Sequence, residues 1–439
     1  MTKTKFISIQ QAMEKSSGKV AVRGWVYRER GSNKMYFLVL RDSSNIIQCV
    51  LKRENFESQW DEIKKLKIES SVELEGDIKE DKRAPTGFEI QVSKFNLVHL
   101  AEDYPINKDL NEDLLGDRRH LWLRSRKMTS ILKIRSTVLE AIREHWLKKG
   151  FYEYHSPEIL GASCEGGSTL FEVNYYGKTA YLSQTWQLHA EPAIFALEKI
   201  FTIQPAFRAE KSKTSRHLSE LWMAEMEVAW AKFSELQDDA EELTKNIIKK
   251  VLEKNKEDLE ILERDLKTLK ATLKKKFPRM TYDEALKFLK EKKKMKVVWG
   301  KDLRTIEEDK LSELYDTPII ITDYPKVVKA FYMKESPETL KKPEDKKTVL
   351  GFDMIGPEGY GELIGGSQRE ERLEIIKENL KEQGEDLSKY EFYFDTRRYG
   401  SIPHGGYGLG VERMISWICG LDTIKDAIAF PRTMTRLNP

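Results

Sequence analysis

Two arginines flank a short polar loop near the middle of the chain, and their side chains are suited to binding phosphate. Arg208 precedes the loop at 211–215 and Arg216 follows it. A guanidinium group donates two parallel hydrogen bonds to phosphate oxygens, so such a pair can hold a polyphosphate. A surface hairpin with solvated charges has the same spacing, and spacing alone leaves both interpretations open.

The segments on either side of this loop have the character of β-strands. Residues 199–203 are largely apolar or β-branched, and between 225 and 230 acidic or small residues alternate with apolar ones. These patterns predict an antiparallel hairpin with one arginine at each foot of its loop. A further arginine, Arg413, follows a glycine-rich segment that permits close backbone approach to a nucleotide, although a helix-start surface arginine would look the same.

Together these segments resemble the motifs of a known enzyme family. Phe-Arg-Ala-Glu at 207–210 with Arg-His-Leu at 216–218 resembles motif 2 of the class II aminoacyl-tRNA synthetases, and Gly408–Arg413 resembles motif 3. They occur in the family's order and separation. The similarity covers most of the chain and is greatest to the asparaginyl members of the aspartyl/asparaginyl/lysyl subgroup.

The resemblance implies a set of ATP contacts. Arg208 would bridge the α-phosphate and the amino-acid carboxylate, Glu210 would read the adenine amino group, and Arg216 and His217 would hold the outer phosphates. Arg413 would bind the γ-phosphate, and Arg208 and Arg413 would act as the catalytic pair. Backbone or side-chain contacts to ATP are also expected from the neighbouring motif residues Ala209, Leu218, Gly410, Val411 and Glu412.

A magnesium site is expected beside the ATP. Glu362 would be a Mg²⁺ ligand, because Mg²⁺ prefers few carboxylates together with phosphate oxygens. Gly365 stands where aspartyl relatives have a serine, so only its backbone or a bound water could contribute.

The amino-acid pocket should carry the specificity. The resemblance places Glu165 on the substrate's α-ammonium group and Gln187 in the pocket, and Arg208 and Gly365 also contact the substrate. Aspartyl members carry a lysine at the position of Ala190, and that lysine pairs with the side chain of the aspartate substrate. Two further residues would read the amide of asparagine: Glu225 would accept from its nitrogen and Arg369 would donate to its oxygen.

Four residues of these segments depart from the family pattern. Leu221 replaces an aromatic residue that stacks on adenine, Trp186 a small residue, His189 a tyrosine and Met223 a histidine. These departures bear on the amino-acid specificity and the rate rather than on the fold.

The first 100 residues predict a small closed barrel. Five short strand patterns with turn signals between them suit an OB-fold, which commonly binds single-stranded nucleic acid. By resemblance, Phe37 would stack on the central anticodon base and Gln48 would hydrogen-bond it, with Arg28 and Arg30 near the phosphates. The alternation around Phe37 also allows it to be a core residue.

We therefore expect an α+β protein with three parts: an OB-fold anticodon domain at 1–100, a hinge at 101–125 and a class II catalytic domain at 126–439. The last part would include an antiparallel sheet flanked by helices and a charged helical segment at about 236–294. Within this part, Thr281 and Glu284 look like a capping box for a helix, and further strands are expected around 318–322 and 330–333. A helical pattern at 131–149 followed by a strand at 151–155 resembles motif 1, the dimer interface of the family, and implies a homodimer. An ordinary buried helix has the same periodicity.

Composition is consistent with a cytoplasmic enzyme. The net charge is only +3, so composition by itself makes no case for nucleic acid. Three separated cysteines form no metal or disulfide pattern, and no stretch is apolar and long enough to span a membrane.

The expected function is ATP-dependent activation of asparagine and its transfer to tRNA(Asn), with Mg²⁺. Two alternatives remain at this point: a tRNA-independent ligase that makes asparagine from aspartate and ammonia, and a non-catalytic synthetase paralogue. Relatives with the first activity lack the barrel, and loss of Arg208, Glu362 and Arg413 would favour the second. The barrel pattern and these three residues are all present in this sequence.

Overall fold

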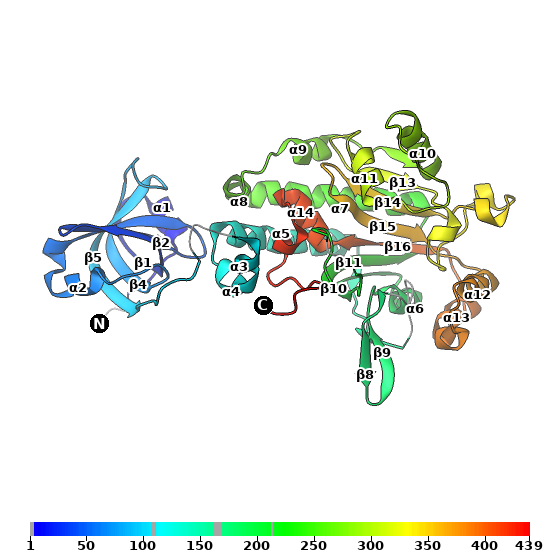
Figure 1. The fold of residues 1–439 in the computed structure, drawn as a ribbon, viewed down its shortest axis with the longest axis horizontal. Coiled ribbons are helices and arrows are strands. Elements are labelled where there is room, and N and C mark those ends of the chain that lie inside the picture. The colour runs from blue at the N-terminus through cyan, green and yellow to red at the C-terminus, as the bar shows by residue number, and fades with distance from the viewer. Residues whose placement is uncertain (1–3, 107–110, 162–168, 212–213) are drawn as a thin grey trace. The chain divides into compact units, whose positions relative to one another are not determined.

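A computed structural model of the protein describes residues 4–106, 111–161, 169–211 and 214–439 (Figure 1). The chain divides into two compact units, Met1–Arg118 and Arg119–Pro439. Over the described residues, none of the helices has the length and apolar character that crossing a membrane requires.

The first unit is a closed five-stranded barrel. Strands β1 (Gly18–Gly31), β2 (Met35–Arg41), β3 (Ile46–Lys52), β4 (Ser71–Glu80) and β5 (Phe88–His99) close in the order β1-β2-β3-β5-β4. Alternate residues of β2 and β4 are buried, so one face of each strand fills the interior. Helices α1 (Ile9–Lys15) and α2 (Trp60–Ile63) add Ile9 and Trp60 to this core. The predicted barrel is confirmed.

The second unit is built on an eight-stranded sheet. Its order is β12-β13-β14-β15-β16-β11-β10-β6. The six strands from β13 to β10 are antiparallel to their neighbours, while β12 and β6 join the two edges in parallel. Their bounds are β12 (Arg279–Thr281), β13 (Ile319–Thr322), β14 (Gly351–Gly356), β15 (Gly361–Gln368), β16 (His404–Gly410), β11 (Glu220–Ala229), β10 (Lys199–Phe207) and β6 (Tyr152–Glu153). The predicted antiparallel hairpin is β10 and β11.

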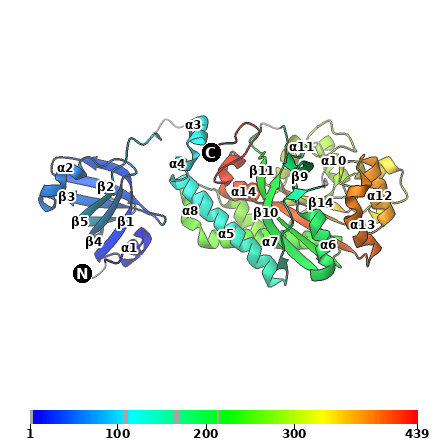
Figure 2. The ribbon, with the colours of Figure 1, turned by 90° about the horizontal axis from the view of Figure 1, so that it is seen from below.

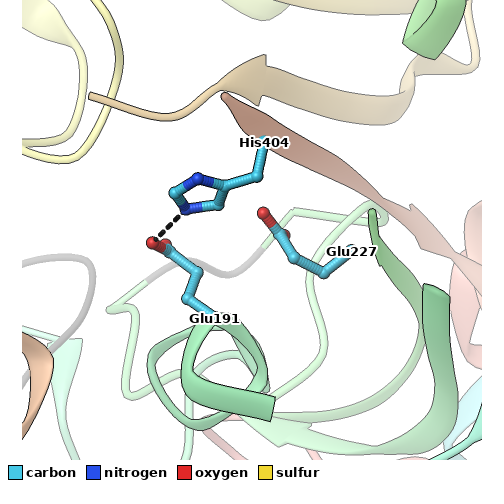
Figure 3. A group of neighbouring side chains, drawn as sticks. All are labelled: Glu191, Glu227 and His404. Carbon is cyan, nitrogen blue, oxygen red and sulfur yellow. Dashed lines mark hydrogen bonds and ion pairs between the residues drawn. The ribbon is translucent and has the colours of Figure 1, made fainter. Parts of the chain in front are cut away.

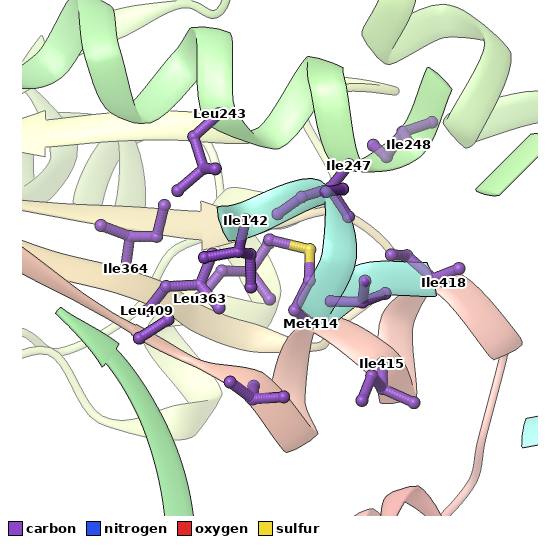
Figure 4. Packing of buried hydrophobic residues seen from close by; sticks show 14 of the residues in the cluster. Ile142, Leu243, Ile247, Ile248, Leu363, Ile364, Leu409, Met414, Ile415 and Ile418 are labelled. Atoms are coloured by element: carbon purple, nitrogen blue, oxygen red, sulfur yellow. The ribbon is translucent and has the colours of Figure 1, made fainter. Parts of the chain in front are cut away.

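Three helices bury the largest hydrophobic core against this sheet. α5 (Arg126–Lys148) and α7 (Phe233–Lys254) lie side by side, and α14 (Val411–Cys419) packs beside them (Figure 2). Figure 4 shows Ile142 of α5, Leu243 and Ile247 of α7 and Met414 of α14 meeting Ile364 of the sheet. This core determines where Arg413, on the first turn of α14, is held.

Smaller elements surround the sheet. α10 (Tyr282–Glu291) packs at the end formed by β12 and β13, and α11 (Thr305–Ser312) packs on α10, β14 and β15. α6 (Gln187–Leu197) covers β10 and β11, and α13 (Glu391–Arg398) packs on α6. The remaining elements are α3 (Glu112–Asp117), α4 (Arg119–Trp122), α8 (Lys256–Ile261), α9 (Lys267–Lys274), α12 (Leu373–Glu382) and a small sheet of β7 (Ile159–Leu160), β9 (Lys178–Leu182) and β8 (Glu172–Tyr175).

Several local expectations can be compared with this fold. The predicted capping box at Thr281 and Glu284 begins α10 as expected. The charged segment at about 236–294 is four helices, α7, α8, α9 and α10, interrupted at Asn255, after Ile261 and at the short strand β12. The expected strand at 330–333 is wrong: Met333 makes only an isolated bridge to Arg369, because Phe331 and Tyr332 turn into an aromatic cluster with α13.

Candidate active site

A cavity of about 580 Å³ opens over the middle of the large sheet. Strands β11, β15 and β16 form its floor, and the segment after β13 forms part of its wall. Six of the predicted site residues line it: Gln187, Arg208, Glu225, Glu362, Gly365 and Arg369. Residues about 180 positions apart in the chain therefore meet at one site, because β11 and β15 both flank β16.

Two of the predicted phosphate-binding arginines line a neighbouring cavity of about 230 Å³. Arg216 and Arg413 contribute to it, together with the turn between β14 and β15. Arg413 Nη1 donates to the backbone oxygen of Glu362, which lines the larger cavity. Arg208, directly after β10, lies on the larger cavity. The three guanidinium groups thus stand along a path from one cavity to the other.

The other polar residues of motif 2 are paired with side chains of the protein. His217 Nε2 lies 3.3 Å from Glu210 Oε2, and its Nδ1 lies 2.5 Å from Thr214 Oγ1. Arg216 pairs with Asp309 of α11 through both terminal nitrogens, at 3.0 and 3.3 Å. The four charged or titratable side chains of these pairs are each about one-third exposed, so a ligand can reach them: Glu210, Arg216, His217 and Asp309.

A group of carboxylates suits a divalent cation at the edge of the larger cavity. Glu362 and Asp353 stand on the paired strands β15 and β14, and Gly365 is the register partner of Asp353. A Cβ atom at Gly365 would lie 2.7 Å from Glu362 Oε1 and 3.5 Å from Asp353 Oδ1. The absent side chain is thus what lets Glu362 lie against the strand. Burial, and then the charge of Asp353, raise the pKa of Glu362, so a cation here would be strongly favourable.

Two more charged residues complete this edge. Lys329 Nζ donates to Asp353 Oδ2 at 2.9 Å and lies 3.6 Å from Asp302 Oδ1. Burial raises the pKa of Glu308 to about 8, and the charge of Glu362 adds to the shift. Burial and the neighbouring carboxylate therefore both favour the protonated form of Glu308.

The predicted amide-reading residues are held rigidly. Glu225 is buried, and its Oε2 accepts hydrogen bonds from Thr185 Oγ1 at 2.8 Å and from the Trp186 backbone nitrogen at 3.0 Å. Arg369 Nε and Nη2 donate to the two oxygens of Glu227 at 3.0 and 2.8 Å. Glu225 and Glu227 lie on the same face of β11, two residues apart.

A buried charge network supports these residues from behind. Figure 3 shows Glu191 of α6 and His404 and Glu227 of the sheet converging, with His404 Nε2 3.0 Å from Glu191 Oε2. Their ligand-type atoms lie within 4.8 Å of one another, a spacing that a metal ion could use. Arginines bind the two carboxylates instead: Arg397 donates to Glu191 at 2.6 Å, and Arg369 donates to Glu227. Burial alone would raise the pKa of Glu191, but Arg397 and His404 hold it below its usual range.

Some predicted residues lie outside both cavities. Ala190 is buried in a small core with Trp186 and Ile194. The Glu412 carboxylate pairs with Arg135 at 2.7 Å and accepts from the Trp222 nitrogen, so it anchors α14 to α5 and β11. Val411 and Leu218 are buried, and Ala209 and Gly410 line neither cavity. The prediction for Glu165 falls outside the described residues.

Two of the four departures from the family pattern line the larger cavity and two do not. Trp186 and Met223 line the larger cavity. His189 stacks on Phe392 with ring centroids 5.2 Å apart and is not among the lining residues, and Leu221 pairs with Ala206 in the hairpin.

Comparison with known proteins agrees with this arrangement. Residues 111–434 match the family described as "tRNA synthetases class II (D, K and N)", and residues 20–98 match "OB-fold nucleic acid binding domain". The chain belongs to the class II tRNA synthetases of the D, K and N group. Among its relatives are the asparagine–tRNA ligases of Thermococcus gammatolerans, 46% identical over 97% of both chains, and of Thermoplasma acidophilum, 45% identical over 99% of this chain and 100% of the other.

A solved structure of the same group has the same fold. The asparaginyl-tRNA synthetase of Pyrococcus horikoshii, in its complex with asparaginyl-adenylate, aligns with a TM-score of 0.94 at 43% identity, and 100% of each chain is covered.

In this synthetase the barrel carries a polar outer face. Phe37 is only partly buried and points away from the core residues of β2, and Arg30 lies over its ring at 5.1 Å. Gln48 is buried on the same face and donates to Glu89 Oε2 at 3.0 Å. The Phe37 side chain therefore lies outside the core, which was one of the two interpretations that the sequence left open.

Sequence reasoning missed four charged residues of the synthetase's site. Glu227 could have been found, because it shares the strand period with Glu225. Asp353 could have been inferred from the hairpin register opposite Gly365. Lys329 lines the larger cavity, and Glu308 lies near Glu362 at the end of β15. Neither carries a local signal, since only the packing of the chain after β13 and of α11 against the sheet brings them there.

Proposed function

We propose that this chain is an asparagine–tRNA ligase: it activates asparagine with ATP and transfers it to tRNA(Asn). The observation that carries the proposal is the near-complete alignment with asparagine–tRNA ligases, and it is supported by a cavity lined by residues that are expected to bind phosphate and amide groups. The reaction forms an aminoacyl-tRNA, AMP and pyrophosphate. Retention of the barrel disfavours a tRNA-independent ligase, and the intact arginine path disfavours a non-catalytic paralogue.

Activation is an attack of the asparagine carboxylate on the α-phosphate of ATP. Such a displacement depends on positioning and on neutralised charge rather than on a general base. Arg208 lines the larger cavity together with Glu225 and Glu362, where it could bind both reacting groups. Arg216 and Arg413 would bind the outer phosphates and favour pyrophosphate as the leaving group, and Glu210 and His217 would stand at the nucleotide.

Mg²⁺ fits the carboxylate group described above. Glu362 and Asp353 would be its protein ligands, and the backbone of Gly365 leaves room for a bound water. When bound, the ion would supply positive charge to the phosphates. Lys329, fixed by Asp353 and Asp302, holds the Asp353 carboxylate in place.

Asparagine selection rests on polarity, because asparagine and aspartate have nearly the same shape. Glu225 would accept from the substrate amide nitrogen and would repel an aspartate carboxylate. Arg369, oriented by Glu227, would donate to the amide oxygen. Ala190 supplies no cation that could compensate an aspartate.

The tRNA would be recognised in part by the barrel. We assign residues 1–100 to the anticodon and 126–439 to catalysis, joined by 101–125. On the outer face, Phe37 would stack on an anticodon base, Gln48 would hydrogen-bond it and Arg28 and Arg30 would approach phosphates. We further propose a cytoplasmic homodimer formed through α5 and the edge strand β6, where Leu147 and Tyr152 are 53% and 59% exposed.

The test is amino-acid-dependent pyrophosphate exchange with asparagine, aspartate and no amino acid, followed by charging of tRNA(Asn). Exchange and charging with asparagine are expected. Exchange with aspartate alone would contradict the proposed specificity, and formation of free asparagine from aspartate and ammonia would support the tRNA-independent ligase. No exchange with any amino acid would support the non-catalytic paralogue.

A further inference from the structure

The fork of Arg216 is occupied by a carboxylate of the protein. Its Nη1 donates to Asp309 Oδ1 at 3.0 Å and its Nη2 to Asp309 Oδ2 at 3.3 Å. This is the end-on, two-point geometry with which an arginine also binds a phosphate group. The Asp309 carboxylate therefore stands where phosphate oxygens would otherwise bind this guanidinium.

The two partners come from different parts of the unit. Arg216 belongs to the segment between β10 and β11, whereas Asp309 is presented by α11. Helix α11 is anchored at its start, where the Arg304 backbone nitrogen donates to Glu307 Oε2 at 2.9 Å, and by Leu311, which is fully buried. The position of Asp309 is thus set by the core, independently of any nucleotide.

The surroundings leave the pair accessible to a ligand. The turn between β14 and β15 packs against it: a Cβ atom at Gly359 would lie 3.5 Å from Asp309 Oδ1 and 3.7 Å from Arg216 Nη2. The other side opens on the 230 Å³ cavity, which Arg413 also lines. The two side chains are 32% and 35% exposed, so water and anions can compete for the guanidinium.

We propose that Asp309 is an internal counter-ion of Arg216, which the outer phosphates of ATP displace on binding and which pairs with Arg216 again when pyrophosphate leaves. The proposal rests on the proposed role of Arg216 in binding those phosphates. Asp309 is thereby a positioning residue: it contacts neither substrate and acts through the arginine. It lowers the affinity for ATP and for pyrophosphate alike, and so favours release of the product.

The size of the effect follows from the exposure of the pair. Exposed ion pairs change an equilibrium by roughly 1.5- to 5-fold. A ligand that needs the free arginine has its apparent affinity reduced by the fraction of molecules in which the arginine is free. Replacing Asp309 by asparagine keeps the shape and removes the charge, so we expect the dissociation constants of ATP and pyrophosphate to fall about two- to fivefold.

The experiment is calorimetric titration of the full chain with ATP, pyrophosphate and AMP in separate runs, each with Mg²⁺ present. The variant is Asp309→Asn. Its matched control is Glu313→Gln, which removes one negative charge directly after α11 from a carboxylate that pairs with Lys293 and Lys310. Asp309→Asn should tighten ATP and pyrophosphate but not AMP, which lacks the outer phosphates, and Glu313→Gln should alter none of the three.

A double-variant cycle separates the pair from general electrostatics. In an Arg216→Gln background, Asp309→Asn should no longer tighten ATP. Unchanged ATP affinity in Asp309→Asn, an equal gain for AMP, the same gain in Glu313→Gln, or a gain that persists without Arg216 would each overturn the proposal. Absence of ATP binding by the wild-type chain would instead contradict the proposed function itself.

Discussion

Replacing Glu225 by glutamine should change which amino acid is activated. In the structure Glu225 Oε2 accepts two hydrogen bonds, from Thr185 Oγ1 and from the Trp186 nitrogen. Both partners are donors, so a glutamine here must direct its amide oxygen to them and turn its amide nitrogen to the other oxygen position. The group at that position changes from an acceptor with negative charge to a neutral donor.

This exchange has opposite consequences for the two substrates. Asparagine loses the acceptor for its side-chain amide and meets a donor instead. Losing a hydrogen bond to a charged group costs about 1.5–3 kcal/mol, and the rate of asparagine activation should therefore fall by roughly one to two decades. Aspartate loses a like-charged neighbour and gains a donor, so its activation should fall less or rise.

The assay is pyrophosphate exchange with each amino acid, compared as kcat/KM. A shift of about tenfold or more in the asparagine-to-aspartate ratio is expected. Thr185→Val is the matched control, since it keeps the shape and leaves the charge of Glu225: it should reduce both rates without reversing the preference. An unchanged ratio in Glu225→Gln would mean that Trp186 and Met223, which depart from the family pattern and line the same cavity, determine the specificity.

Four further predictions concern other parts of the chain. Arg208→Ala should abolish adenylate formation in a folded protein, and a rate within about tenfold of wild type, or roughly 1.4 kcal/mol of barrier, would refute its role at the α-phosphate. Phe37→Ala should weaken tRNA charging by roughly 1–3 kcal/mol, the usual worth of a base–aromatic stack, and leave tRNA-independent activation unchanged; equal loss in both assays would contradict the stacking role. Light scattering at micromolar concentration should return twice the 51.2 kDa mass of one chain, and a monomer mass would contradict the homodimer. The Asp239 side chain is only 12% exposed, yet hydrogen bonds from His145, Lys149 and Tyr407 lower its pKa. The carboxylate therefore stabilises the fold above the unfolded-state pKa of about 4, and this contribution is lost as the pH falls below that value. Asp239→Asn should lower the unfolding free energy at pH 7 by about 1.5–3 kcal/mol and flatten its decline below pH 4 in urea titrations, whereas an unchanged decline at acid pH would contradict this.

Elements with a local signal were predicted well. The alternation of buried and exposed residues in β2 and β4 reflects contacts that repeat along the strand itself, so the period of two was visible in the sequence. The capping box of α10 is likewise a contact between residues three apart. The strand predicted at 330–333 was wrong because the apolar residues there pack into a cluster with α13, which is far along the chain. Such packing overrides local strand propensity.

The site divides in the same way. The sequence by itself determined which type of reaction the chain can catalyse, since the arginines at 208, 216 and 413 are recognised from the residues next to them in the chain. Their partners depend on the strand order: Glu227 and Arg369 are 142 residues apart, Arg216 and Asp309 are 93 apart, and Glu191 and His404 are 213 apart. Only the tertiary structure decided these pairs, because β16 lies between β11 and β15 and because α11 packs against the sheet. Charge interactions act through space over a few ångströms. The separation of two residues along the chain therefore does not predict which distant carboxylate will pair with which arginine.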